Sequence, residues 1–377
     1  MTALQESEAL HQAVRDFGAT ALSGRWALSQ QAAQFDALAL RIAHFQAQHC
    51  DPVRRLFASH DLEVSSLRSA AELPALPSDA FRLSRVACHD CALDQAKYRS
   101  SGTTARHTAE HGLRTVATYR YLSTRLGREA LLGEAERATV IALLPAPSQI
   151  PHSSLGAMCQ FFIEEFDGRA LPDEATPFAK RWLVSDAGVD SEQLRTAAQV
   201  AAQRGEGLLV LATSLSLQLL LRDHAAHPIA LPANSAVMQT GGSKGRREAI
   251  DAAELSRQVA DFFQIAPQQI IGEYGMTELS SQLYEGYRWQ SEAPSGVYFS
   301  PPWLQVTPVD PITLAPVAAG EAGLARFVDL GNIDSAVAIV TGDLIRQEGS
   351  GIRLLGRQPN SPLRGCSLLI EPFLSPG

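Results

Sequence analysis

Apolar residues recur at intervals of three and four along the first hundred residues, a spacing that places them on one face of an α-helix. Residues 31–46 give the clearest stripe, which consists of Phe35, Leu38, Ile42 and Phe45. Prolines and small residues around positions 73–78 interrupt this pattern. We therefore expect a helical amino-terminal region over residues 1–95.

The pattern changes from position 139 onward, where short apolar runs alternate with helical stretches. Each run looks like a buried strand that ends in a polar or glycine-bearing loop, and the runs are residues 138–145, 207–213, 235–242 and 268–275. Helical stretches between them include residues 191–204 and 251–263. This alternation predicts an α/β fold, in which a mainly parallel sheet carries helices on its faces and ligands bind at the carboxyl ends of the strands.

After position 296 the chain changes to short strands and turns, which predicts a smaller β-rich part. We expect an α/β core over residues 96–295, a β-rich subdomain over 296–357 and a tail over 358–377. No clean linker separates these parts in the sequence, so we expect them to be subdomains of one body.

Composition narrows the classes of function. The 377 residues are 45% apolar and 19% charged, the balance of a globular protein with a core. A formal net charge of −8 without a basic run argues against nucleic acid as a partner. Five cysteines, an odd number, favour a reducing compartment over a disulfide framework. The amino terminus does not resemble a signal peptide. The most hydrophobic stretch, residues 208–221, is too short and too polar to span a bilayer. We expect a cytoplasmic protein.

A run of hydroxyl-bearing residues follows the helical region and consists of Ser100, Ser101, Gly102, Thr103 and Thr104. Loops of this kind can bind phosphate through backbone N–H and side-chain O–H donors. The run lacks the Gly-Lys-Ser/Thr ending of a P-loop, so a plain polar turn is the alternative interpretation.

A second motif directly follows the predicted strand and consists of Tyr274, Gly275, Met276, Thr277 and Glu278. Gly275 permits a tight turn, and Thr277 can both cap a following helix and donate to a phosphate. Glu278 offers hard oxygen ligands suited to Mg²⁺. A helix-capping turn with an acidic residue at its start is the alternative.

Two further candidates lie later in the chain. Asp343, in the sequence Thr341-Gly342-Asp343, follows an apolar run and can accept from both hydroxyls of a ribose, although Gly-Asp also favours a hairpin turn. Arg357 follows Gly356 and can reach a ribose or a phosphate, and a surface arginine is the alternative.

In their order and spacing these motifs resemble the acyl-adenylate-forming (ANL) superfamily, which includes acyl-CoA ligases, firefly luciferase and peptide-synthetase adenylation domains. The resemblance covers about residues 97–368. It implies ATP and Mg²⁺ as cofactors, with the serine- and threonine-rich run on the phosphates and residues 274–278 as the adenine and metal loop. It also implies that Asp343 binds the ribose and that Arg357 is the hinge arginine. Gly241 and Gly242 would flank the adenine.

The sequence departs from this superfamily in two places. The phosphate loop usually continues with glycine and lysine, whereas Ala105, Arg106 and His107 follow here, and Arg106 is a candidate for the missing positive charge. After Arg357 too few residues follow for the mobile carboxyl-terminal domain, whose lysine assists adenylation. We therefore expect the large amino-terminal domain of the adenylate-forming fold, without the full mobile domain.

The tail contains the sequence Leu-Arg-Gly-Cys-Ser-Leu at residues 363–368. A short superfamily member with this tail resembles the acyl-protein synthetase family of the bacterial fatty-acid reductase complex. In that family a cysteine near the carboxyl terminus takes the acyl group from the adenylate and holds it as a thioester for a partner reductase. The resemblance implies that Cys366 is this nucleophile, with the Arg364 cation favouring the thiolate. A small buried cysteine is the alternative.

The other cysteines carry weaker signals. Cys88 and Cys91 form a C-x-x-C pair, which is half of a zinc site or a redox pair, but no second pair follows at a suitable spacing. We expect ordinary structural roles for these two, and core or helix positions for Cys50 and Cys159.

One loop is a candidate for contact with the acyl substrate. His152 and Ser153 follow a predicted strand at a place where the superfamily often has a residue that gates the acyl pocket. A loop histidine with ordinary hydrogen bonds is the alternative.

Together these features predict an AMP-forming acid–thiol ligase. The substrate carboxylate, that of a fatty acid by resemblance, attacks the α-phosphate of ATP, Mg-pyrophosphate leaves, and Cys366 receives the acyl group. The expected partner is a protein acceptor or acyl reductase. One rival passes the acyl group to coenzyme A or a carrier protein. The other, motivated by the altered phosphate loop, is an inactive adenylate-fold scaffold or nucleotide sensor.

Overall fold

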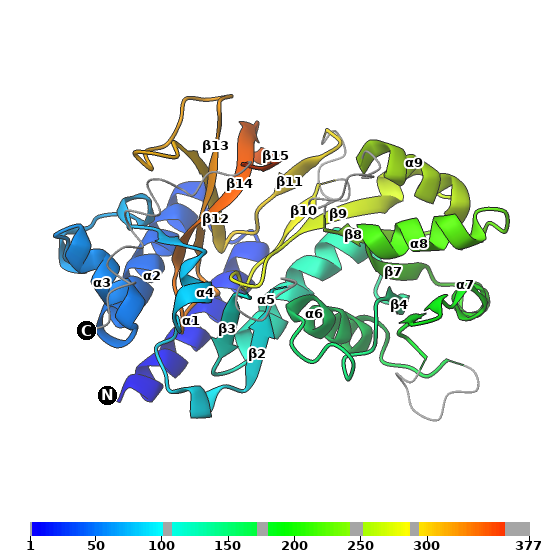
Figure 1. Cartoon of the computed structure of the whole chain (residues 1–377), viewed down its shortest axis with the longest axis horizontal. Helices are drawn as coiled ribbons and strands as arrows, with labels where there is room; N and C mark the ends of the chain where they lie inside the picture. The colour runs from blue at the N-terminus through cyan, green and yellow to red at the C-terminus, as the bar shows by residue number, and fades with distance from the viewer. Residues whose placement is uncertain (1, 101–107, 172–179, 242–251, 287–293, 359–377) are drawn as a thin grey trace. The chain divides into compact units, whose positions relative to one another are not determined.

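The chain forms two compact units, each assembled from segments that are distant in the sequence (Figure 1). The structure is a computed structural model, and it describes residues 2–100, 108–171, 180–241, 252–286 and 294–358. Of these, unit 1 contains the residues up to Ser123, Met276–Gln282 and those from Phe299 onward. Unit 2 contains the described residues of Thr124–Gly275 and of Leu283–Tyr298.

Unit 2 is built on a mainly parallel sheet. Its parallel strands lie in the order β4 (Thr139–Leu143), β7 (Leu208–Thr213), β8 (Ala236–Thr240) and β9 (Ile270–Tyr274). Strand β10 (Leu283–Glu285) pairs antiparallel with β9, and β11 (Val297–Phe299) follows in the strand order. A small hairpin is formed by β5 (Val184–Ser185) and β6 (Gly188–Val189). Residues 139–143 and 208–212 are buried throughout, as expected for parallel strands covered on both faces.

Helices cover both faces of this sheet. Helices α7 (Ser191–Gln203), α8 (Ser214–His224) and α9 (Ala252–Phe263) bury apolar side chains in one cluster with alternate strand residues such as Val210 and Val237. Helix α6 (Ser154–Phe162) lies on the opposite face from α8 and α9 (Figure 1). Strand β7 ends at Thr213 because the Thr213 hydroxyl accepts from the Ser216 backbone N–H and caps α8.

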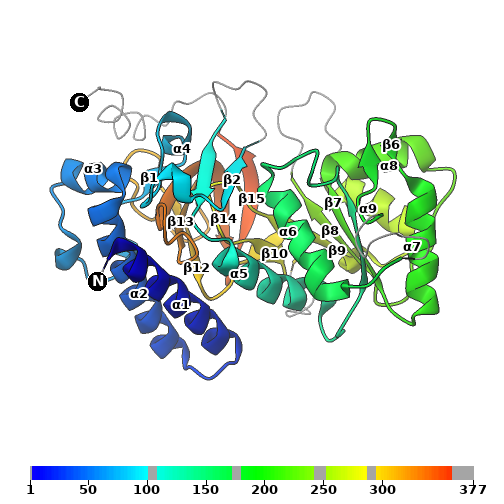
Figure 2. The same cartoon turned by 90° about the horizontal axis from the view of Figure 1, so that it is seen from below.

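Unit 1 combines helices with antiparallel strands. Helices α1 (Ala3–Leu22) and α2 (Leu28–His49) form an antiparallel pair, and α3 (Asp51–Ser59) follows (Figure 2). The antiparallel strands are β12 (Leu304–Val309), β13 (Ala322–Asp329), β14 (Ala338–Glu348) and β15 (Gly351–Arg357). Strand β1 (Leu76–Pro77) pairs parallel with β14. The unit also contains α4 (Ala80–Leu83) and the hairpin of β2 (Ala96–Arg99) and β3 (Glu110–Leu113), while α5 (Ala117–Gly127) crosses the boundary in the chain.

Most predicted elements are confirmed. The four apolar runs form β4, β7, β8 and β9, and the two helical stretches form α7 and α9. The predicted stripe on α2 is buried in full. Residues 208–221 form a strand and then a helix, and no helix among the described residues is long and apolar enough to cross a membrane. The expectation of mainly helix is wrong for residues 60–99, which hold only short helical turns, α4, β1 and β2, because Leu76 and Pro77 pair with β14 instead.

A buried loop joins β13 to β14, and α2 holds it in place. Residues 330–337 are all buried. Gln46, which is 0% exposed, donates to the carbonyls of Asn332 (2.6 Å) and Ile333 (2.9 Å) and accepts from the Val337 N–H (3.0 Å). One amide therefore satisfies three backbone groups that the sheet does not pair.

Replacement of this amide should be costly. We expect Gln46→Ala to lower the free energy of unfolding by about 3–5 kcal/mol, because it leaves three buried backbone groups without their partner. Gln48→Ala, an exposed glutamine on the same helix, is the matched control and should change stability by less than about 0.5 kcal/mol. Urea unfolding measures both, and equal effects would show that α2 does not anchor the loop.

Candidate active site

The hairpin of β2 and β3 brackets the predicted phosphate-binding run. Ser100 directly follows β2, its N–H donates to the Ala109 carbonyl, and its hydroxyl accepts from the Ala109 N–H, both at 3.0 Å. Ser100 therefore closes the base of the run. The remaining members, Ser101, Gly102, Thr103 and Thr104, and also Arg106, lie outside the described residues, so their contacts with phosphate stay predictions.

The second motif runs from unit 2 into unit 1. Tyr274 ends β9, Gly275 follows, and Met276, Thr277 and Glu278 belong to unit 1. The helix expected after Glu278 does not form in the described segment 275–286, where a turn at residues 277–278 leads to β10. The prediction of a helix cap at Thr277 is therefore wrong.

The helix does not form because side chains distant in the sequence occupy the backbone groups that it would need. The Thr277 carbonyl lies 2.9 Å from His111 Nδ1, and the Glu278 carbonyl accepts from Asn332 Nδ2 at 2.8 Å. Asp329 accepts from the Ser280 N–H at 2.9 Å. Side chains from elsewhere in the chain hold this backbone in a non-helical form.

His111, Asp329 and Asn332 were not predicted as site residues. Burial is the main cause of both pKa shifts in this group: it lowers the pKa of His111 to about 4 and raises that of Asp329 to about 6. For Asp329 and Asn332 the sequence does contain a signal. They belong to the segment Asp-Leu-Gly-Asn-Ile-Asp-Ser at 329–335, which is rich in polar residues and lies between two apolar runs.

The Glu278 carboxylate fits the predicted magnesium ligand. Glu278 is only 8% exposed, and a carboxylate supplies the hard oxygens that Mg²⁺ prefers. The described part of the chain contains no group of three or more side chains that could hold a metal ion by themselves. Mg²⁺ is often bound through one carboxylate, with phosphates and water as its other ligands.

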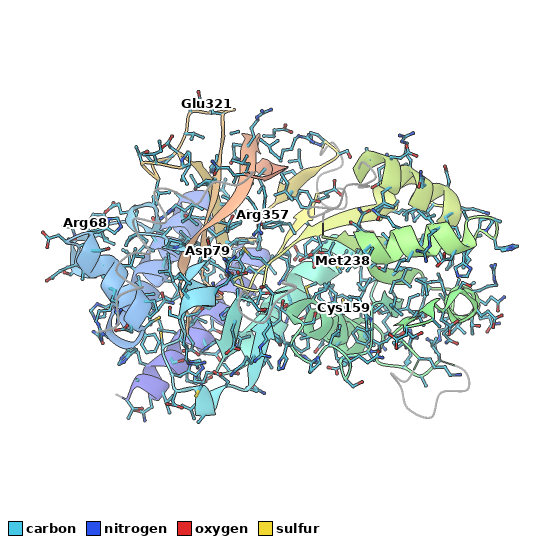
Figure 3. All side chains as sticks on the ribbon, in the orientation of Figure 1. Arg68, Asp79, Cys159, Met238, Glu321 and Arg357 are labelled. Atoms are coloured by element: carbon cyan, nitrogen blue, oxygen red, sulfur yellow. The ribbon has the colours of Figure 1, made fainter. Side chains whose placement is uncertain are left out.

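Asp343 and Arg357 are brought together on the hairpin of β14 and β15. They are directly opposite in register, and Arg357 Nε donates to Asp343 Oδ1 at 2.9 Å. Figure 3 labels Arg357. The register shifts between Leu344 and Ile345, which leaves Leu355 as an extra residue on β15, and Gly356 has a φ of +95°. The hairpin turn considered for Asp343 is wrong, because this residue lies within β14.

The carboxyl ends of three parallel strands lie in register in unit 2. Thr213 pairs with Thr240, and Thr240 pairs with Glu273. Gly241 follows β8 at a φ of +76°, which glycine adopts easily, and its carbonyl accepts from the Ser214 hydroxyl. Gly242 lies outside the described residues. That Gly241, Gly242 and Tyr274 flank an adenine stays a prediction.

Glu273 is a buried carboxyl group that the sequence analysis did not identify. It is 5% exposed and accepts from the Thr240 hydroxyl. Burial raises its pKa to about 7, and the Thr240 hydrogen bond opposes this shift only in part.

The predicted acyl-pocket loop precedes α6. Ser153 caps this helix, since its hydroxyl accepts from the Gly156 N–H at 3.0 Å. His152 lies in the exposed turn before the cap. A helix-capping role for Ser153 is thus observed, while contact of either residue with an acyl substrate stays a prediction.

The described cysteines are not arranged as a C-x-x-C pair would require. The thiol of the half-buried Cys88 hydrogen-bonds with that of the buried Cys50, whereas Cys91 is exposed. Cys159 is buried on α6 (Figure 3), and burial raises the pKa of its thiol. Cys50 and Cys159 therefore occupy the interior positions expected of them. Cys366 lies outside the described residues.

The fold is that of the adenylate-forming ligases. A crystal structure of 2-hydroxyisobutyryl-CoA ligase in an open conformation, in complex with 2-HIB-AMP and CoA, matches with a TM-score of 0.59 and 12% identity, over 87% of this chain and 71% of that one. Its thioesterification state matches with a TM-score of 0.58 and 14% identity, over 95% and 69%. The predicted fold class is confirmed.

Within this fold, the carboxyl-terminal part resembles one family. The family model "Acyl-protein synthetase, LuxE" matches residues 207–374. The long-chain-fatty-acid–luciferin-component ligases of Vibrio harveyi and Aliivibrio fischeri are 27% identical over 139 residues and 28% identical over 141 residues. Each alignment covers 34% of this chain and only 35% of the relative. The predicted resemblance to acyl-protein synthetases is confirmed over this part of the chain.

The buried Glu273 should give stability a characteristic pH dependence. Its folded-state pKa lies above the ordinary value of 4.5. The stabilisation that Glu273 contributes to the folded state is therefore fully present below pH 4.5 and is lost as the pH rises to about 7. Relative to the unsubstituted chain, Glu273→Gln should gain up to about 3 kcal/mol of stability between pH 5 and pH 8, at about 1.4 kcal/mol per pKa unit.

Chemical denaturation across this pH range measures the difference between the two proteins. Glu192→Gln, at an exposed glutamate on α7 of the same unit, should leave the pH profile unchanged. Parallel profiles for Glu273→Gln and the unsubstituted chain would contradict the assignment of a protonated buried carboxyl.

Proposed function

We propose that this chain uses ATP and Mg²⁺ to activate a carboxylic acid, in the first instance a fatty acid, as an acyl-adenylate and transfers the acyl group to its own Cys366. One observation carries the proposal: the match to the acyl-protein synthetase family spans Thr277, Glu278, Asp343, Arg357 and Cys366, in a chain with the adenylate-forming fold. A cytoplasmic location fits this chemistry.

The first half-reaction forms the acyl-adenylate. The acid carboxylate attacks the α-phosphorus, and the bond to pyrophosphate breaks. The Thr277 hydroxyl and the hydroxyls of the run from Ser100 to Thr104 donate to the phosphates as charge develops on their oxygens. Asp343 accepts from the ribose hydroxyls, and its contact with Arg357 orients it. Glu278 would hold Mg²⁺, which when bound neutralises charge on the departing pyrophosphate.

The second half-reaction moves the acyl group to sulfur. The Cys366 thiolate, having lost its proton to water, attacks the carbonyl carbon of the mixed anhydride. The C–S bond forms, the bond from that carbon to the phosphate oxygen breaks, and AMP leaves with the electron pair. The thioester keeps the acyl group activated for a protein acceptor or acyl reductase. The names of the luciferin-component ligases motivate both the fatty acid and the protein partner.

Intact-mass spectrometry with ATP, Mg²⁺ and a mixed acid library tests the transfer to Cys366. The unsubstituted chain should gain one acyl group that hydroxylamine removes. Cys366→Ser should show no stable acylation but keep acid-dependent exchange of pyrophosphate into ATP. Cys91→Ser, at an exposed cysteine, should behave like the unsubstituted chain.

Three other results would contradict this reading. Acylation that persists in Cys366→Ser excludes this cysteine as the acceptor. A thioester that appears only on added coenzyme A or carrier protein favours the rival ligase. No pyrophosphate exchange across a broad acid panel favours the inactive scaffold.

The Asp343–Arg357 pair, in which Arg357 is exposed and Asp343 is half-buried, allows binding to be separated from folding. The Arg357 side chain is 59% exposed, so the pair contributes about 1 kcal/mol or less to stability. Asp343→Ala should raise the ATP concentration for half-maximal pyrophosphate exchange at least about tenfold, equivalent to about 1.4 kcal/mol, with almost unchanged unfolding. Glu348→Ala breaks a comparable pair with Arg353 on the same hairpin and should leave the ATP dependence unchanged. Equal effects would exclude a ribose-binding role for Asp343.

A further inference from the structure

Residues 278–282 are buried, yet they form neither helix nor strand. Backbone groups in such a segment need hydrogen-bond partners, because water does not reach them. The Leu279 N–H donates to the Met276 carbonyl at 3.1 Å. Side chains at the end of β13 and in the loop that follows it hydrogen-bond to this segment, and His111 on β3 contacts the carbonyl of the preceding Thr277. Residues distant in the sequence therefore set the conformation of the motif.

His111 makes the contact to the first carbonyl, and its protonation pattern follows from its neighbours. A carbonyl oxygen only accepts, so Nδ1 must carry the hydrogen and donate to Thr277 at 2.9 Å. The ring is fully buried, and its lowered pKa keeps it neutral at physiological pH. Nε2 therefore accepts from the Ser335 hydroxyl at 3.0 Å, and Phe81 packs edge-on against the ring.

Asn332 makes the contact to the next carbonyl. Its Nδ2 donates to Glu278, and its Oδ1 accepts from the Ser280 hydroxyl at 2.8 Å. Asp329 accepts from the Ser281 hydroxyl at 2.6 Å. Successive residues of the motif are thus held by His111 on β3 and by side chains at the end of β13 and in the loop after it.

The position of His111 in the chain gives this contact a second consequence. His111 lies on β3, which is the return strand of the hairpin that brackets the phosphate-binding run, and it pairs with Tyr98 on β2. Its imidazole therefore fixes the hairpin relative to the backbone of Thr277 and Glu278, all within unit 1.

We propose that His111 is a positioning residue for adenylation, which holds the Thr277 carbonyl so that the Thr277 hydroxyl and the Glu278 carboxylate face the phosphates and Mg²⁺ of the nucleotide. This inference rests on the proposed function. Asn332 and Ser335 complete the arrangement, the first by holding Glu278 and the second by fixing the imidazole tautomer. None of the three touches the reacting atoms.

Two substitutions at His111 separate positioning from packing. His111→Leu removes both ring nitrogens, whereas His111→Asn keeps an amide donor near the place of Nδ1. In pyrophosphate exchange well below each unfolding temperature, His111→Leu should raise the ATP and Mg²⁺ concentrations for half-maximal rate by about tenfold to a hundredfold, as for other groups that orient ligands. The half-saturating acid concentration should change little, and His111→Asn should recover most of the loss.

A matched pair of serines controls for the loss of a buried hydroxyl. Ser335→Ala removes the donor to His111, and Ser235→Ala removes a hydroxyl that is equally buried and accepts from the Leu208 N–H in unit 2. Both should lower the unfolding temperature. Only Ser335→Ala should raise the requirement for ATP and Mg²⁺, and an equal effect of both would overturn the positioning role.

Failure of this inference can be told apart from failure of the proposed function. Unchanged ATP and Mg²⁺ dependence in His111→Leu overturns the inference and leaves acid activation intact. If that variant does not fold, His111→Asn and Ser335→Ala carry the test. If the unsubstituted chain shows no pyrophosphate exchange, calorimetric titration with Mg–ATP replaces the exchange assay. Weaker Mg–ATP binding in the variants then supports the positioning role, while acid activation fails. No Mg–ATP binding to the unsubstituted chain overturns both the positioning role and the proposed function.

Discussion

Buried backbone without regular secondary structure must be satisfied by side chains, and two segments of unit 1 meet this constraint through one residue. Asn332 accepts from Gln46 of α2 on its backbone carbonyl, and its side-chain amide donates to the Glu278 carbonyl. A continuous set of hydrogen bonds thus leads from an amino-terminal helix to the predicted magnesium ligand. The helical amino-terminal region is therefore part of the support of the site.

Two buried groups of the same network, His111 and Asp329, have opposite pKa shifts and therefore opposite effects on stability. The folded-state pKa of His111 lies below its ordinary 6.5, at about 4, so its contribution is lost as the pH falls through this window. The folded-state pKa of Asp329 lies above its ordinary 3.8, at about 6, so its contribution is lost as the pH rises through nearly the same window. Between about pH 4 and 6 the two slopes of unfolding free energy against pH therefore partly cancel.

Local patterns in the sequence identify the elements of this fold well, and long-range contacts explain what they miss. The apolar runs of β4, β7, β8 and β9 are strong signals because parallel strands covered on both faces bury nearly every residue, and the stripe on α2 is strong because burial there follows the helical period. Thr277 and Glu278 carry an equally plausible helix signal, which fails because their carbonyls bond to side chains 166 and 54 residues away. No window of local sequence contains that information. His111 was missed for the same reason.

The hairpin of Asp343 and Arg357 has local features that lower its own stability. The bulge at Leu355 interrupts the hydrogen-bond ladder, and Gly356 adopts a positive φ at the entropic cost of a glycine within a strand. In the ion pair that results, the Arg357 side chain is 59% exposed and the Asp343 side chain 18%, and the pair stabilises the fold by about 1 kcal/mol or less. These local costs are not offset by the pair itself. A ligand that uses the aligned carboxylate and guanidinium would offset them, which is the pattern expected where function overrides local stability.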